Sequence, residues 1–196
     1  NGAGIINFIV PETGVYGFEI QGASSMPQEY SSQLWPHYGK GANFRGAVSL
    51  VSGERIYVAA GSLPLNAWSY NAWDGNIAAL PNPSGSDVFN GGGGGTFVAF
   101  GGSSYGNANP LIVAGGGGSV RVGYEYDATQ VHARVDFITS GHDGGGGPGG
   151  TGGNGGTFNG NINDGGSDAG TPGAGFYNDA QSGSYSSYTA AKGFRN

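Results

Sequence analysis

Residues 146–157 consist of four Gly-Gly-X triplets, whose only side chains recur at every third position: Pro148, Thr151, Asn154 and Thr157. This period matches neither an α-helix nor a β-strand, but it fits an extended left-handed helix of the polyproline type, with about three residues per turn. Such a helix leaves two edges of bare backbone that other backbones can approach. Because glycine loses the most conformational freedom on folding, the segment is either a flexible linker or a rod held by many backbone partners.

The composition is compatible with a globular chain despite its high glycine content. Glycine supplies 44 of the 196 residues, yet 37% of the residues are hydrophobic and 12% are aromatic. A disordered chain would lack such apolar content. A collagen triple helix would need glycine at every third position throughout.

Charge and cysteine content exclude several classes of partner and site. Only 10% of the residues are charged, the net charge is −6, and the seven Lys and Arg residues form no cluster. Nucleic-acid binding depends on neutralising phosphates, so we expect no nucleic-acid partner. The absence of cysteine excludes disulfides and Cys-ligated zinc. No apolar run is long enough to span a bilayer, so we expect no membrane insertion.

The first 60 residues carry the alternating pattern of antiparallel strands. Tyr16, Phe18 and Ile20 alternate with small or polar residues and predict a strand with one buried face. Residues 48–51 and 56–60 predict further strands, and Ile5–Val10 is an apolar run that ends in a turn. We expect a polar loop over 22–41 and a long insertion with aromatic residues over 61–90.

In the middle of the chain, glycine runs adjoin apolar runs. Residues 91–95 precede the apolar run 96–100, and the apolar run 110–114 precedes the glycines 115–118. Unbroken apolar runs of this length predict strands buried on both faces. Residues 119–138 predict a hairpin, because apolar residues alternate along both arms. No segment has a capped helical stripe, so the residues alone predict an all-β, glycine-rich chain.

Segments that resemble a known family are 8–18, 22–23, 39–42 with Gly46, 53–61, Gly-Gly-Gly-Gly-Gly-Thr-Phe-Val at 91–98, and Pro-Leu-Ile-Val-Ala-Gly-Gly-Gly-Gly at 110–118. The pattern is similar to the glycine-rich ectodomain of anaplastic lymphoma kinase, leukocyte tyrosine kinase and bacterial glycine-rich proteins. A weaker similarity is to phage tail-fibre adhesins, whose tips use packed polyglycine helices. The match covers most of the first 120 residues, whereas the tail matches in composition only.

The resemblance implies a tumour-necrosis-factor-like β-sandwich (jelly roll) with packed polyglycine-II helices. Residues 1–140 would then form the sandwich core, with glycine-rich insertions at 91–95 and 115–118 and the hairpin at 119–138. Residues 141–196 would form a polyglycine-helix region packed on that core. Two features depart from the family: the absence of cysteine, and a hairpin at 119–138 where the family has a more glycine-rich insertion. Receptor signalling is not carried over, because the sequence contains no kinase domain.

Three segments of the sequence match patterns found in reactive or ligand-binding sites. Residues 102–106 fit the Gly-x-Ser-x-Gly elbow around Ser104, with His132 and Asp136 as possible partners, but a turn follows where the elbow needs a helix. Residues 147–152 fit a phosphate-loop pattern without the helix that would hold a phosphate. Asn and Asp residues at 161–168 could bind calcium or simply form turns. We therefore expect no catalytic residue, no cofactor and no metal.

Aromatic residues supply the candidate interface. Asn-Ala-Trp occurs twice within residues 66–73, and exposed aromatic side chains can anchor protein contacts or stack on sugars. The alternative is that Trp68 and Trp73 cover the sandwich core. The candidate interface residues are Trp35, Trp68, Tyr70, Trp73, Tyr124 and Tyr126.

These features predict a non-enzymatic structural module, located extracellularly or at the cell surface, that self-associates as a subunit of a filament, fibre or matrix. Its partner would be itself, through strand edges at Ile5–Val10 and in the 119–138 hairpin. The alternative is an adhesin or receptor ectodomain whose loops at 23–45 and 62–90 recognise a cell-surface protein or glycan. An enzyme that uses Ser104 or His132 is a third hypothesis.

Overall fold

The computed structural model describes residues 4–25, 28–30, 33–35, 39–61, 67–69, 88–90, 93–117, 133, 154, 175–178 and 194–195. Its regular elements there are β-strands and one 3₁₀ helix, η1 (Tyr105–Asn107). All of the described strand pairs are antiparallel. The all-β class predicted from the sequence is therefore confirmed.

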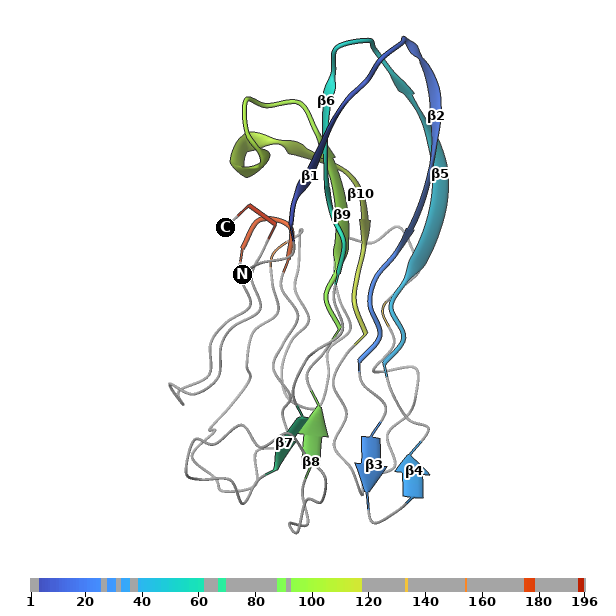
Figure 1. Ribbon diagram of the computed structural model, residues 1–196, viewed down its shortest axis with the longest axis vertical. Helices are drawn as coiled ribbons and strands as arrows, with labels where there is room; N and C mark the ends of the chain where they lie inside the picture. The colour runs from blue at the N-terminus through green and yellow to red at the C-terminus, as the bar shows by residue number, and fades with distance from the viewer. Residues whose placement is uncertain are drawn as a thin grey trace.

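The largest sheet has four strands, in the order β1 (Ile6–Ile9), β6 (Arg55–Ala59), β9 (Thr96–Phe100) and β10 (Asn109–Ala114). Its central strands β6 and β9 carry apolar side chains on both faces. Val58 lies opposite Val98 on one face, and Ala59 lies opposite Phe97 on the other. A sheet with two apolar faces needs a covering layer on each, and both layers are present (Figure 1).

The first covering layer is the pair β2 (Gly14–Gln21) and β5 (Asn43–Leu50). Side chains on one face of β2 point toward the larger sheet, and those on its other face are exposed, as the alternation predicted. The aromatic rings of Tyr16, Phe18 and Phe44 pack against this core but stay half-buried. The buried residues of the core are Val10, Ile20, Ala42, Leu50, Ile56, Val98 and Ala114.

The second covering layer comes from the C-terminal part of the chain. The rings of Phe176 and Phe194 stack with centroids 4.9 Å apart, and both lie against Phe97 of β9 at 6.1 and 5.7 Å. Figure 1 shows these short segments in red, on the side of the sheet away from β2 and β5. The four-stranded sheet is therefore the middle of three layers.

One strand prediction was wrong. The run at 110–114 was expected to be buried on both faces, but β10 is an edge strand in which Asn109, Pro110 and Val113 are exposed. An edge tolerates Pro110, because proline has no N–H to donate to a neighbour. The pairing of β10 with β9 also shifts between Pro110 and Ile112, as at a β-bulge.

Two segments expected to be loops contain short hairpins. The 22–41 segment holds β3 (Gln28–Tyr30) and β4 (Gln33–Trp35). The 61–90 insertion holds β7 (Ala67–Ser69) and β8 (Val88–Asn90). The predicted 119–138 hairpin lies outside the described residues except for Ala133, and the triplets at 146–157 lie outside them except for Asn154.

Candidate functional site

Four glycine-containing segments, which we call the glycine net, adjoin the sandwich strands in the sequence: 22–25 follows β2, 39–42 precedes β5, 93–95 precedes β9 and 115–117 follows β10. Backbone hydrogen bonds of 2.8–2.9 Å connect them, for example from Ala23 N–H to the Gly94 carbonyl and from Gly117 N–H to the Ala23 carbonyl. Segment 22–25 bonds to all three of the others, and so does 115–117. A strand in a sheet has only two lateral neighbours, so these segments pack in two dimensions rather than in one plane.

The backbones in the net approach so closely that no side chain fits between them. A Cβ built on Gly22 would lie 2.0 Å from the Gly115 carbonyl oxygen, and one on Gly116 would lie 1.9 Å from that of Gly93. The same holds for Gly41, Gly93 and Gly117, at 1.9–2.0 Å from a carbonyl oxygen. Their Cα–H groups therefore face carbonyl oxygens, as in weak C–H···O contacts.

The backbone conformation of the net does not itself require glycine. Among the described glycines, φ is positive only at Gly53, Gly101 and Gly102, none of which is in the net. Glycines in the β2–β5 pair are different again, since a Cβ on Gly17 or Gly46 would meet nothing within 4 Å. The net therefore requires glycine because neighbouring backbones leave no room for a Cβ atom.

Two buried hydroxyl groups bond to backbone in and beside the net: Ser25 within it, and Thr96 directly after segment 93–95. The hydroxyl of Thr96 donates to the Gln21 carbonyl at 2.6 Å and accepts from the Gly61 N–H at 3.0 Å. Ser25 is completely buried and accepts from the Gly39 N–H at 2.7 Å. Each hydroxyl satisfies backbone groups that a hydrophobic residue would leave unpaired.

The hairpins β3–β4 and β7–β8 lie together at the end of the molecule away from the sandwich (Figure 1). Two candidate interface residues are thereby placed: Trp35 lies in β4 opposite Gln28, and Trp68 lies in β7 opposite Phe89. The other four candidates, Tyr70, Trp73, Tyr124 and Tyr126, lie outside the described residues.

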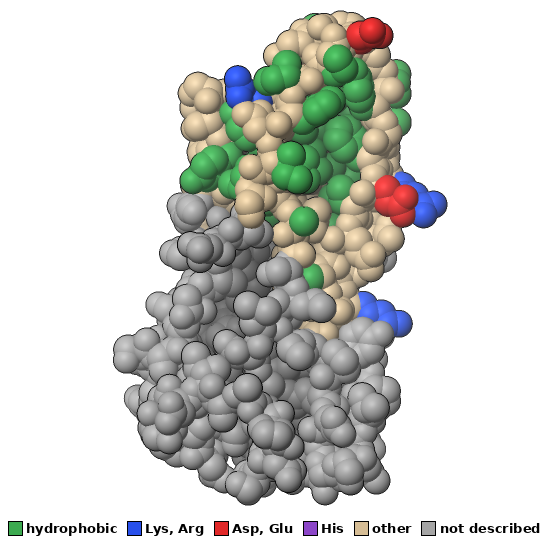
Figure 2. Space-filling model, viewed as in Figure 1, with side chains coloured by type: hydrophobic (Ala, Val, Ile, Leu, Met, Phe, Trp, Pro, Cys, Tyr) green, Lys and Arg blue, Asp and Glu red, His purple; other side chains and the backbone are tan. Residues whose placement is uncertain are grey.

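The structure shows a further apolar surface that the aromatic pattern missed. In β1, Ile6, Phe8 and Ile9 are 65%, 44% and 46% exposed. Strand β1 pairs with β6, and no other described strand pairs with it. Figure 2 shows hydrophobic side chains gathered on the sandwich half of the molecule. The signal in the sequence was the apolar run Ile5–Val10, which was identified there as a strand edge but not as an exposed surface.

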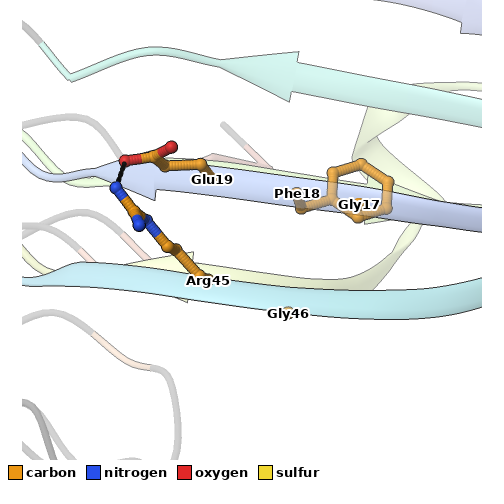
Figure 3. A pocket seen from close by; sticks show the side chains of 5 residues that line it. All are labelled: Gly17, Phe18, Glu19, Arg45 and Gly46. Carbon is orange, nitrogen blue, oxygen red and sulfur yellow. Dashed lines mark hydrogen bonds and ion pairs between the residues drawn. The ribbon is translucent and has the colours of Figure 1, made fainter.

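A shallow depression lies on the β2–β5 pair, lined by Gly17, Phe18, Glu19, Arg45 and Gly46 (Figure 3). Glu19 and Arg45 form an ion pair of 2.7 Å between side chains that are 57% and 75% exposed. Exposed pairs of this kind contribute little to stability. The depression is open to solvent and suggests no chemistry beyond this pair.

Ser104 has a structural role in the turn between β9 and β10. Its backbone N–H donates to Asn107 Oδ1 at 3.0 Å, and its hydroxyl lies 3.4 Å from the same atom. The preceding glycines 101 and 102 have φ of 69° and 72°. His132 and Asp136 lie outside the described residues, as do the phosphate-loop pattern and the Asn/Asp segment at 161–168.

Over the described ranges, no group of three His, Cys, Asp or Glu residues is placed to hold a metal ion. The same part of the chain contains no helix with the length and hydropathy of a membrane span. Comparison of the chain with protein-family models, with curated proteins and with solved structures finds no match.

Proposed function

We propose that this chain is a non-enzymatic structural module that self-associates outside the cell, as a subunit of a surface filament, fibre or matrix. The observation that carries the proposal is the contrast between the two edges of the four-stranded sheet. Natural sheets protect exposed edges with charged residues, proline or bulges, because a bare edge pairs with other chains. In this sheet the β10 edge has protecting features of this kind, and the β1 edge has none.

The edge strand β10 is protected by Pro110 and by the shift in pairing between Pro110 and Ile112. The other edge, β1, reads Ile-Asn-Phe-Ile, with no charge, proline or glycine, and its pairing with β6 is unbroken. An edge that is apolar, regular and exposed favours pairing with another chain. A second copy fits this edge, because β1 has no charged residue and two such edges therefore bring no like charges together.

The finer architecture is part of the proposal. We infer that the glycine net is an array of polyglycine-II helices, because two of its four segments each bond to the other three and its close contacts bring Cα–H groups against carbonyl oxygens. The two facing sheets fit the jelly roll that the family resemblance implies. The extracellular or cell-surface location rests on the same resemblance.

Sedimentation velocity over a range of concentrations tests the proposal. The wild-type chain should sediment faster as its concentration rises, whereas Ile6→Lys should remain monomeric, because the buried edge would hold an unpaired charge. Val15→Lys is the matched control, since Val15 is an exposed residue of another strand, at 73%. A wild-type chain that stays monomeric at millimolar concentration would refute self-association.

The second candidate function is recognition of a cell-surface protein or glycan. It is favoured by the placement of two Trp-bearing hairpins, β3–β4 and β7–β8, at one end of the molecule (Figure 1). Screening of glycans and surface proteins would test it. Binding that is lost in Trp68→Ala and kept in Ile6→Lys would support this function, and a screen without any binder would count against it.

A further inference from the structure

We propose that strand β1 of one copy pairs with β1 of a second copy in an antiparallel arrangement. The two copies would be related by a two-fold axis that passes between their Asn7 residues. The inference rests on the proposed self-association and specifies its geometry. The product would be a continuous sheet of eight strands, with the order β10-β9-β6-β1 in one copy followed by β1-β6-β9-β10 in the other.

The backbone directions in β1 decide which residues can form the new bonds. Val10 donates to the Glu54 carbonyl and accepts from the Gly53 N–H, so both of its backbone groups face the β6 side. Residues along an antiparallel strand alternate between pairs that exchange hydrogen bonds and pairs that do not. Ile6 and Phe8 therefore direct their backbone groups toward β6. Ile5, Asn7 and Ile9 direct theirs toward the open edge.

A two-fold axis at Asn7 uses all three of these outward-facing residues. Asn7 then lies opposite Asn7 of the second copy, and Ile5 lies opposite Ile9 of the second copy, so every outward-facing residue meets another. An axis at Phe8 would instead place Ile5 opposite Pro11, which has no N–H to donate. An axis at Ile6 would place Ile9 opposite residue 3, beyond the described strand.

The side chains also suit this register. Ile6 would lie opposite Phe8 of the second copy, twice by symmetry, and the two would cover apolar surface that is now 65% and 44% exposed. Aromatic and β-branched residues are favourable cross-strand partners. The run from Ile5 to Val10 has no charged residue, so the two-fold axis brings no like charges together. An isologous contact of this kind closes after two copies, so the β1 pair would be the building block of a filament or matrix, and a second contact elsewhere on the chain would join the dimers.

Disulfide trapping with single cysteines tests the register, because the chain has no natural cysteine. Residues opposite each other in a hydrogen-bonded pair have Cα atoms about 5.5 Å apart, within the range that a disulfide spans. Under mild oxidation with copper phenanthroline, Asn7→Cys should form covalent dimers at least tenfold faster than Val113→Cys, the matched variant on the β10 edge. Faster trapping of Ile6→Cys or Phe8→Cys than of Asn7→Cys would overturn the register.

An experiment with a mixture of two variants tests the same register without substituting Asn7. Ile5→Cys and Ile9→Cys should each trap slowly alone and rapidly when mixed, since these residues face each other across the axis. Absence of mixed trapping would contradict the geometry. Sedimentation of the same samples separates the two proposals: association without trapping overturns the register only, whereas a monomer at all concentrations overturns self-association as well.

Discussion

At Gly116, a methyl group would lie 1.9 Å from the carbonyl oxygen of Gly93, whereas at Gly46 it would meet nothing within 4 Å. Gly116→Ala must therefore push two backbones of the glycine net apart, and we expect it to lower the free energy of unfolding by about 2 kcal/mol or more. Gly46→Ala should be neutral or stabilising by about 0.5 kcal/mol, because alanine restricts the unfolded chain. Thermal or urea denaturation of the two variants measures the difference. Equal stabilities would show that the net is not closely packed.

A buried hydroxyl is the second residue-scale feature that the fold depends on. Thr96 satisfies both the Gln21 carbonyl and the Gly61 N–H. Thr96→Val keeps the shape of the side chain and leaves these groups unpaired, so we expect a loss of about 1–3 kcal/mol. Thr13→Val is the control: its hydroxyl accepts one bond, from the Ser52 N–H, at an exposed site where water can substitute, and the loss should stay below about 1 kcal/mol. A urea titration of both variants decides, and similar midpoints would count against the role of Thr96.

The sequence could identify glycine-rich segments but could not separate the roles of individual glycines. Gly93 and Gly116 belong to runs that adjoin apolar strands, and the runs pointed to packing. Gly22 and Gly41 stand outside any run, yet they make contacts as close as those of Gly116. These contacts join segments that are far apart in the chain. A local sequence pattern therefore cannot predict which glycines make them.

At the scale of elements, residues 194–195 fasten the second covering layer to the sheet. The guanidinium of Arg195 donates to the carbonyl of the buried Ala108 from two nitrogens. It also lies over the ring of Tyr177, 4.9 Å from the centroid, and over that of Phe176 at 5.5 Å. The planar guanidinium donates hydrogen bonds and stacks on aromatic rings at the same time, and the ammonium group of lysine cannot do both.

Arg195→Lys should therefore reduce the free energy of unfolding by about 1–2 kcal/mol, although the charge is kept. Arg45→Lys is the matched control, because Arg45 pairs with Glu19 at a largely exposed site, where such pairs contribute at most about 1 kcal/mol. Differential scanning calorimetry of both variants provides the measurement. A larger loss in Arg45→Lys than in Arg195→Lys would contradict this account of the C-terminal contact.

The strands differ in how well the sequence predicted them. Strand β2 was predicted with its buried face, because one covered face leaves a period of two in the sequence. Strand β9 was predicted as buried on both faces, which the structure confirms. Strand β10 has a similar apolar run but lies at an edge. An apolar run reports hydrophobicity and not position in a sheet, and Pro110 was the only local sign of an edge.

At the scale of the whole molecule, the described residues form two parts. One is the sandwich, and the other is the glycine net with the two small hairpins. The sandwich supplies an apolar edge at β1, and the glycine net lies between the sandwich and the hairpins at the opposite end (Figure 1). The proposed pairing at β1 leaves those hairpins free. A self-associating module and a recognition end are therefore compatible in one chain. The sequence alone suggested both functions but could not show that the surfaces proposed for them, β1 and the two hairpins, lie in different parts of the molecule.

Salt should distinguish an apolar edge contact from an electrostatic one. Each copy carries a net charge of −6, and the β1 edge itself is uncharged, so the long-range force between two copies is repulsive. Added salt screens this repulsion over distances beyond about 8–10 Å. We expect the dissociation constant to fall by about two- to fivefold between 20 and 500 mM NaCl, measured by sedimentation equilibrium. The Ile6→Lys variant should remain monomeric at both salt concentrations. A dissociation constant that rises tenfold with salt would show that opposite charges hold the copies together, and would place the contact away from β1.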